Sequence, residues 1–159
     1  MIVSLLLYTG MRRNELLSLQ VRDIDLYGHE ITIRAETSKS KKTRILKLHP
    51  TLMLHIRDYY KERNARHLKS EYLILSNKGD SGLTLEGLKH WTDALNRKSG
   101  VKFHLHLFRH TFACKLSEAD VNVFKIQKML GHTDISMTMK YARSLRTEDM
   151  ATDISKISI

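Results

Sequence analysis

The sequence predicts an α+β fold, with a mostly helical domain and one small three-stranded antiparallel sheet near its N-terminus. Short runs of β-branched and apolar residues, separated by turn residues, occupy positions 21–48, which is typical of strands. Outside that segment, apolar residues recur at helical spacing. The length of 159 residues is sufficient for one domain with a hydrophobic core.

The first two elements are predicted to be a buried helix and a short second helix. Residues 2–8 are apolar, and Gly10 breaks the chain before a helix from Arg12 to Leu19. The apolar opening lacks a basic leader and a small-residue cleavage site, so it is not a signal peptide. We expect it to be the second half of a helix whose first half is missing, as in a fragment cut from a longer protein.

Each of the three predicted strands is rich in β-branched and apolar residues. They contain Ile24 and Leu26, then Ile31 and Ile33, and finally Ile45, Leu46 and Leu48. Turn residues lie between them at positions 27–29 and 37–42. The second turn is rich in lysine and is expected to form a basic hairpin tip.

Further helices are predicted after the sheet. Pro50 suits the first turn of a helix running to about Ala65, and Thr84 is expected to cap a helix that continues to about Ser99. After Gly100, helices are expected at about 105–118, 122–130, 134–143 and 147–155.

The composition indicates an intracellular protein that binds a polyanion. The chain has 27 Lys and Arg against 17 Asp and Glu, a formal net charge of +10, which favours nucleic acid as a partner. Cys114 is the only cysteine, so a disulfide framework is excluded and a reducing compartment such as the cytoplasm fits. No apolar run approaches the roughly 20 residues that a membrane span requires, so we expect no membrane partner.

Three motifs carry residues suited to phosphate chemistry. They are Thr9-Gly10-Met11-Arg12, His106-Leu107-Phe108-Arg109, and the segment from His132 to Tyr141, nine residues later. Arginine is always charged and donates paired hydrogen bonds to phosphate. Histidine can transfer protons, and a tyrosine phenol can form a reversible phosphodiester.

In this order, the motifs resemble the active site of the tyrosine recombinases, the phage-integrase family of DNA strand-exchange enzymes. The resemblance extends from residue 1 to about 143. It implies that Arg12 and Arg109 clamp the scissile phosphate, that His132 contacts a non-bridging oxygen, and that Tyr141 is the nucleophile. His106 would serve as a hydrogen-bonding residue or base. Glu15, three residues after Arg12, matches an acidic position that is structural in the family.

The resemblance also implies a mobile lysine in the basic hairpin that protonates the leaving oxygen. Lys39 is the preferred residue, although Lys41 and Lys42 lie in the same turn and spacing does not separate them. Because the family's hairpin reaches into the DNA groove beside the cut, Lys39, Lys41, Lys42 and Arg44 are all expected to contact DNA.

The implied activity is site-specific recombination through a 3′-phosphotyrosyl intermediate, in a catalytic domain like that of lambda-type integrases. Residues 1–143 would form this domain and residues 144–159 a tail. The core-binding domain that precedes it in relatives is not in the sequence. The tail, with Ile154, Ile157 and Ile159 as apolar anchors, would dock on a neighbouring subunit or fold back. Double-stranded DNA is the expected partner, in the cytoplasm of a bacterium or phage-infected cell, with a tetramer on DNA for the full-length protein and a monomer for this fragment. No cofactor and no metal are expected, because the covalent intermediate conserves the energy of the broken bond.

Other interpretations use only part of these features. His106 and His110 lie four residues apart on one helical face, with Cys114 nearby, but further zinc ligands at suitable spacing are missing. Residues 122–132 could form half of a helix-turn-helix in a non-catalytic DNA-binding module. A type IB topoisomerase would share the chemistry. In an enzyme the arginines and histidines must converge on one phosphate-sized pocket, whereas in a simple binder they would be scattered.

Overall fold

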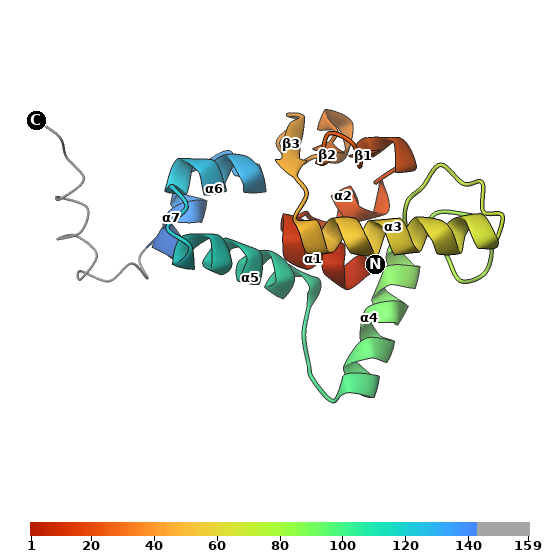
Figure 1. The fold of residues 1–159 in the computed structure, drawn as a ribbon. Coiled ribbons are helices and arrows are strands. Elements are labelled where there is room, and N and C mark those ends of the chain that lie inside the picture. Colours follow the sequence, from red (N-terminus) through yellow and green to blue (C-terminus); the bar gives the residue numbers. More distant parts are fainter. Residues whose placement is uncertain (143–159) are drawn as a thin grey trace, which may run out of the picture.

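A small antiparallel sheet lies at one edge of a mostly helical domain in the computed structural model, which describes residues 1–142 (Figure 1). This architecture confirms the predicted α+β fold. The elements are α1 (Ile2–Thr9), α2 (Arg13–Leu17), β1 (Ile24–Asp25), β2 (Glu30–Ile33), β3 (Arg44–Lys47), α3 (Pro50–Ala65), α4 (Leu85–Ser99), α5 (Leu105–Glu118), α6 (Val123–Leu130) and α7 (Ser136–Ala142), with 3-10 turns at Val21–Asp23 and Ala35–Thr37.

The sheet has the order β1-β2-β3, and both neighbouring pairs are antiparallel. Ile31 pairs with Ile24 on one side and with Leu46 on the other. Along β3 the side chains alternate between buried and exposed, as the pleat of a strand requires. Leu46 therefore lies in the core, whereas Ile45 is 58% exposed.

Two hydrophobic clusters hold the chain together. The larger contains buried side chains from α1, α2, the sheet, α3 and α4. The smaller is formed by Ala113, Ile126, Leu130 and Tyr141 of α5, α6 and α7, which lie together to one side of α1 and α3 (Figure 1). The interior of the second cluster thus includes the candidate nucleophile.

The two clusters meet where α1 packs against α5. Gly10 ends α1 in the left-handed conformation, with φ of 58°. A Cβ at this position would lie 2.4 Å from Cδ1 of Phe112 in α5. Glycine is needed both for the backbone conformation and for the close approach of the two helices.

The bounds of the helices agree with the predicted bounds to within two residues at each end. Pro50 begins α3 and Ala65 ends it, and Oγ1 of Thr84 accepts a hydrogen bond from the backbone of Gly87 at the start of α4. The helix predicted from Arg12 to Leu19 is shorter, because Arg12 is an extended N-cap residue rather than a helical one. The helix predicted at 147–155 and the tail at 144–159 lie outside the described residues. Within residues 1–142, no helix has both the length and the apolar character needed to cross a membrane.

Candidate active site

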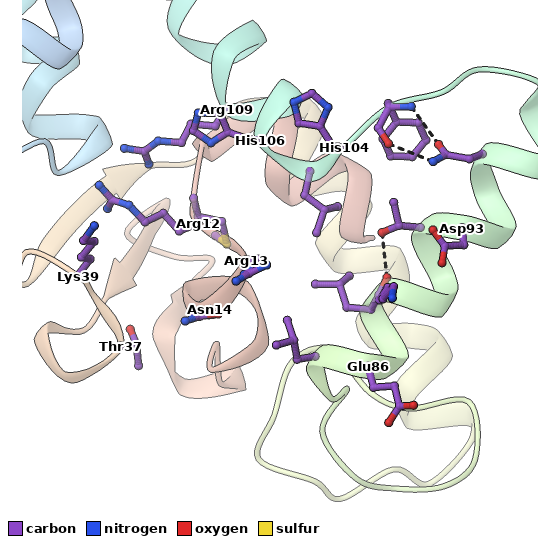
Figure 2. Close-up of a pocket in the computed structure, with 18 of the residues that line it drawn as sticks. Arg12, Arg13, Asn14, Thr37, Lys39, Glu86, Asp93, His104, His106 and Arg109 are labelled. Carbon is purple, nitrogen blue, oxygen red and sulfur yellow. Dashed lines mark hydrogen bonds between the residues drawn. The ribbon is translucent and has the colours of Figure 1, made fainter.

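An open cleft of about 1240 Å³ lies between the start of α2, the β2–β3 hairpin, α4 and the start of α5. Arg12, Lys39, His106 and Arg109 all line it, and they gather at one end of the cleft (Figure 2). The acidic side chains of α4 that Figure 2 labels lie toward the other end. Four of the six predicted catalytic residues therefore share one basic surface, although they come from distant parts of the sequence.

Arg12 is held at this surface by Glu15. The backbone N–H of Arg12 donates to Oε2 of Glu15 at 2.8 Å, and Nη1 of Arg12 lies 3.3 Å from Oε1. The Glu15 side chain is fully buried, whereas 24% of the Arg12 side chain remains exposed. The guanidinium of Arg12 can therefore still reach an anion in the cleft.

Arg109 is the more rigid of the two predicted clamp arginines. It is 3% exposed, and its Nη1 and Nη2 donate to the carbonyls of Gly10 at 2.7 Å and Leu130 at 2.8 Å. Burial, followed by the positive charge of Arg12, lowers the pKa of Arg109 to about 10. Its guanidinium therefore stays charged at neutral pH, in a setting where its charge is weakly screened.

Arg44 does not occupy the position predicted for it. It was expected to contact DNA, but its side chain is only 5% exposed. Nη1 and Nη2 donate to the two carboxylate oxygens of Glu15, at 2.9 and 2.7 Å, and Nε donates to the carbonyl of Met129 at 2.8 Å. The side chain of Arg44 is buried because Arg44 begins β3 on the same face as Leu46, which points inward.

The C-terminus of α6 is where the three arginines come together. The last carbonyls of a helix have no partner within the helix, and they carry partial negative charge. Here Arg44 donates to Met129, Arg109 to Leu130 and Arg12 to Gly131, the last at 3.2 Å. These bonds attach α6 to β3, to α5 and to the start of α2.

His132 follows this helix end directly and is half-buried. Its Nδ1 lies 2.8 Å from Oγ1 of Thr138 in α7. Burial, and then the positive charges of Arg109, Arg12 and Arg44, lower the pKa of His132 to about 4. The ring is therefore neutral at pH 7. His132 adjoins the arginines but is not among the residues that line the cleft.

His106 projects from the first turn of α5 into the cleft (Figure 2). Desolvation, and then the neighbouring charge of Arg109, lower its pKa. A histidine with a lowered pKa is deprotonated at neutral pH, so it can accept a proton or a hydrogen bond.

Tyr141 lies in the second hydrophobic cluster and is 9% exposed. Burial raises the pKa of its phenol, while the charge of Arg109 acts in the opposite direction. Oγ of the buried Ser117 donates to the carbonyl of Tyr141 at 2.8 Å, which fixes α7 against α5. Sequence reasoning had not identified Ser117 or Thr138.

Lys39 is the only one of the three hairpin lysines that lines the cleft. Lys41 and Lys42 lie in the same turn but are not among the residues that line the cleft, and Lys41 has a positive φ of 50°. Lys39 therefore shares the cleft with Arg12, His106 and Arg109.

Of the residues weighed as zinc ligands, His106, His110 and Cys114, the last two contact one another. Sγ of Cys114 lies 3.6 Å from Nε2 of His110. The ring of His110 is 5.3 Å from that of Tyr141. His110 therefore packs beside the candidate nucleophile, and Cys114 is half-buried.

Comparison with solved structures places this fold among the tyrosine recombinase catalytic domains. The crystal structure of a XerA recombinase matches with a TM-score of 0.77 and 26% sequence identity, covering 99% of this chain and 58% of that chain. The sequence profile of the phage integrase family matches residues 1–148. The chain belongs to the phage integrase family, which confirms the resemblance inferred from its motifs.

Individual relatives agree with this assignment. The chain is 36% identical over 141 residues to the tyrosine recombinase XerA of Saccharolobus solfataricus, covering 89% of this chain and 44% of the relative. It is 32% identical over 143 residues to the tyrosine recombinase XerC of Staphylococcus aureus, covering 88% of this chain and 47% of the relative. The chain thus spans less than half the length of these two relatives.

Proposed function

We propose that this chain is the catalytic part of a site-specific DNA recombinase that cuts and rejoins strands through a phosphotyrosyl bond on Tyr141. The observation that carries the proposal is the cleft in which Arg12, Arg109, His106 and Lys39 meet. A simple DNA-binding module has no need for two clamp arginines and two possible proton carriers around one cavity. The partner is double-stranded DNA.

The arginines stabilise the transition state in the proposed reaction. Attack on a phosphodiester gives a five-coordinate phosphorus with negative charge on its non-bridging oxygens. Arg109 is buried and fixed by two carbonyls, so its charge is preorganised where this negative charge develops. Arg12 supplies a second, more exposed guanidinium, and His132 donates to a non-bridging oxygen.

Three residues handle the nucleophile and the protons. The Tyr141 phenol is neutral at pH 7, since burial raises its pKa further above the ordinary value of 10, so a base must accept its proton as it attacks phosphorus. His106, with its lowered pKa, is assigned this task. Attack forms a bond between the phenol oxygen and phosphorus and breaks the bond from phosphorus to the 5′ oxygen. Lys39 protonates that leaving oxygen.

The second half of the reaction reverses the first with a different strand. The 5′ hydroxyl of a partner strand attacks the phosphotyrosine and releases Tyr141. A second round resolves the resulting Holliday junction. We expect a tetramer of the full-length protein on DNA, with residues 144–159 as the candidate segment for docking between subunits.

Covalent trapping tests this proposal without knowledge of the target site. A pool of nicked duplexes with random sequence around the nick lets the freed 5′ end diffuse away after cleavage. The 159-residue chain is incubated with the pool at low ionic strength, because phosphate contacts weaken with salt. We expect a slowly migrating protein–DNA species on a denaturing gel. Mass spectrometry of its peptides should place the nucleotide on Tyr141.

The trapped species also separates the related activities. A duplex with a free 5′ hydroxyl is added to it, and transfer of the trapped strand to this new duplex supports a recombinase. Resealing of the original strand alone would support a topoisomerase. A nucleotide on a residue other than Tyr141 would contradict the proposed site, and DNA binding with no covalent species would favour a non-catalytic module.

A sulfur substitution tests Lys39 as the general acid. Lys39→Ala should slow adduct formation on ordinary DNA by about 10²- to 10⁴-fold, the usual contribution of a general acid. Replacing the bridging 5′ oxygen with sulfur should restore most of the rate, because a thiolate leaves without needing a proton. Rates of adduct formation on the two substrates provide the measurement.

Lys41→Ala is the matched control for this experiment, since Lys41 lies in the same turn but does not line the cleft. It should be slowed much less than Lys39→Ala and should gain nothing specific from the sulfur substrate. Equal slowing of Lys39→Ala on both substrates would remove Lys39 from this role, and sulfur rescue of Lys41→Ala would transfer the role to Lys41.

A further inference from the structure

The buried Thr138 makes a hydrogen bond to the imidazole of the half-buried His132. Thr138 lies in α7, three residues before Tyr141, and is 0% exposed. Its Oγ1 is 2.8 Å from Nδ1 of His132. No sequence motif had drawn attention to this threonine, and its polar side chain would be costly to bury without a partner.

The surroundings of the hydroxyl determine which group donates. A neutral imidazole carries a proton on one nitrogen only, and a hydroxyl can donate or accept. If Nδ1 carried the proton, the hydroxyl would accept it and its own hydrogen would need another acceptor. Among residues 1–142, Oγ1 of Thr138 has His132 as its only hydrogen-bond partner. An unsatisfied buried donor costs about 1–3 kcal/mol, so the arrangement in which Thr138 donates is favoured.

We propose that Thr138 is a positioning residue for the proposed strand-cleavage reaction, which holds His132 in the tautomer with its proton on Nε2. Nε2 has no hydrogen-bond partner within the described part of the chain. With the proton on this nitrogen, neutral His132 donates to a non-bridging phosphate oxygen. The opposite tautomer would present a lone pair to the phosphate and repel it.

The bond also couples the histidine to the nucleophile. Thr138 and Tyr141 lie about one turn apart in the same short helix. The bond from Ser117 to the Tyr141 carbonyl fixes this helix against α5. Only when α7 is docked does Thr138 reach His132, so the position that places Tyr141 also sets the tautomer of His132.

The tautomer can be measured directly by ¹⁵N NMR of the 159-residue chain at pH 7, where a pKa near 4 leaves His132 neutral. The spectrum of His132→Gln assigns the signals. We expect the parent to show an Nε2-protonated ring. Thr138→Ser, which keeps the hydroxyl, should show the same ring, whereas Thr138→Val, which keeps the shape and removes the donor, should show a mixture of tautomers.

The parent spectrum alone can overturn the proposal, even if Thr138→Val fails to fold. An Nδ1-protonated ring in the parent would show that Thr138 accepts rather than donates. An unchanged tautomer in folded Thr138→Val would show that other groups set it. Neither result depends on DNA cleavage, so they are separate from a failure of the proposed function.

The kinetic consequence is tested with the same variants on the nicked duplex pool. At saturating DNA, Thr138→Val should form adduct about tenfold more slowly, the effect of one hydrogen bond in the transition state. Thr138→Ser should restore the rate. Equal rates for the parent and folded Thr138→Val would refute a positioning role in cleavage.

Discussion

Tyr141→Phe should abolish the covalent protein–DNA adduct on nicked duplex DNA. The substitution removes one oxygen atom, and in the proposed mechanism this oxygen forms the bond to phosphorus. The residues that line the cleft would remain in place, but water activated by His106 is a far weaker substitute for a fixed phenol. The measurement is a denaturing gel of the parent and variant incubated with the same labelled DNA pool.

Folding should be nearly unaffected by this change. The ring of Tyr141 packs in the second hydrophobic cluster, and phenylalanine preserves that packing. Loss of the hydroxyl should cost no more than about 1.5 kcal/mol of unfolding free energy, the usual upper value for one hydrogen bond. Tyr27→Phe is a suitable control because Tyr27 is 98% exposed; it should retain full adduct formation. An adduct that persists in Tyr141→Phe would identify another nucleophile.

Several residues of the candidate site could be predicted from the sequence. Arg12, His106 and Arg109 lie in short local motifs, and their residue types match the demands of a phosphoryl transition state. Local signals also predicted the helix that begins at Pro50 and the cap at Thr84. Each of these features depends on residues close together in the chain, which is why the sequence reveals them.

The burial of Arg44 could also have been predicted, from the alternation of side chains along β3. Arg44 follows a run of lysines, and this neighbourhood predicts a DNA-binding residue. The alternation of β3 places it on the same face as Leu46, which is buried. Period-two alternation alone therefore predicts an inward arginine, and an inward arginine needs a buried acidic partner. Glu15 had been noted as structural, but no spacing rule connects residues 29 positions apart.

The arrangement around α6 could not have been predicted from local patterns. Its terminal carbonyls receive bonds from three arginines, and the contact from Arg12 spans 119 residues. The bond between Thr138 and His132 depends on how α7 folds back on α6. Such contacts arise from the packing of whole elements, and local sequence patterns do not show which side chains will meet.

Arg44→Met should cause the largest loss of stability among substitutions at this site. It would leave the fully buried Glu15 without its bidentate partner and free the carbonyl of Met129. Removing one member of a buried ion pair typically costs about 3–5 kcal/mol. Urea unfolding of the parent and variant at pH 7 measures this difference. Arg66→Met is the control, because the Arg66–Glu62 pair is more than half exposed and should contribute less than about 1 kcal/mol.

The difference in unfolding free energy between the parent and Arg44→Met should depend on pH, and this dependence identifies Glu15 as its cause. Burial alone would raise the pKa of Glu15, but the hydrogen bond and charge of Arg44, together with Arg12, lower it below its ordinary value of 4.5. A lowered pKa stabilises the folded parent above the unfolded-state pKa, and this contribution is lost as the pH falls through the folded-state pKa. In Arg44→Met the buried carboxylate keeps only Arg12 as a partner, so its burial is less well compensated and protonation relieves the variant. The gap in unfolding free energy should therefore narrow in acid. A gap that stays constant from pH 7 to pH 3 would mean that Arg44 stabilises the fold through packing and its bond to Met129 rather than through Glu15.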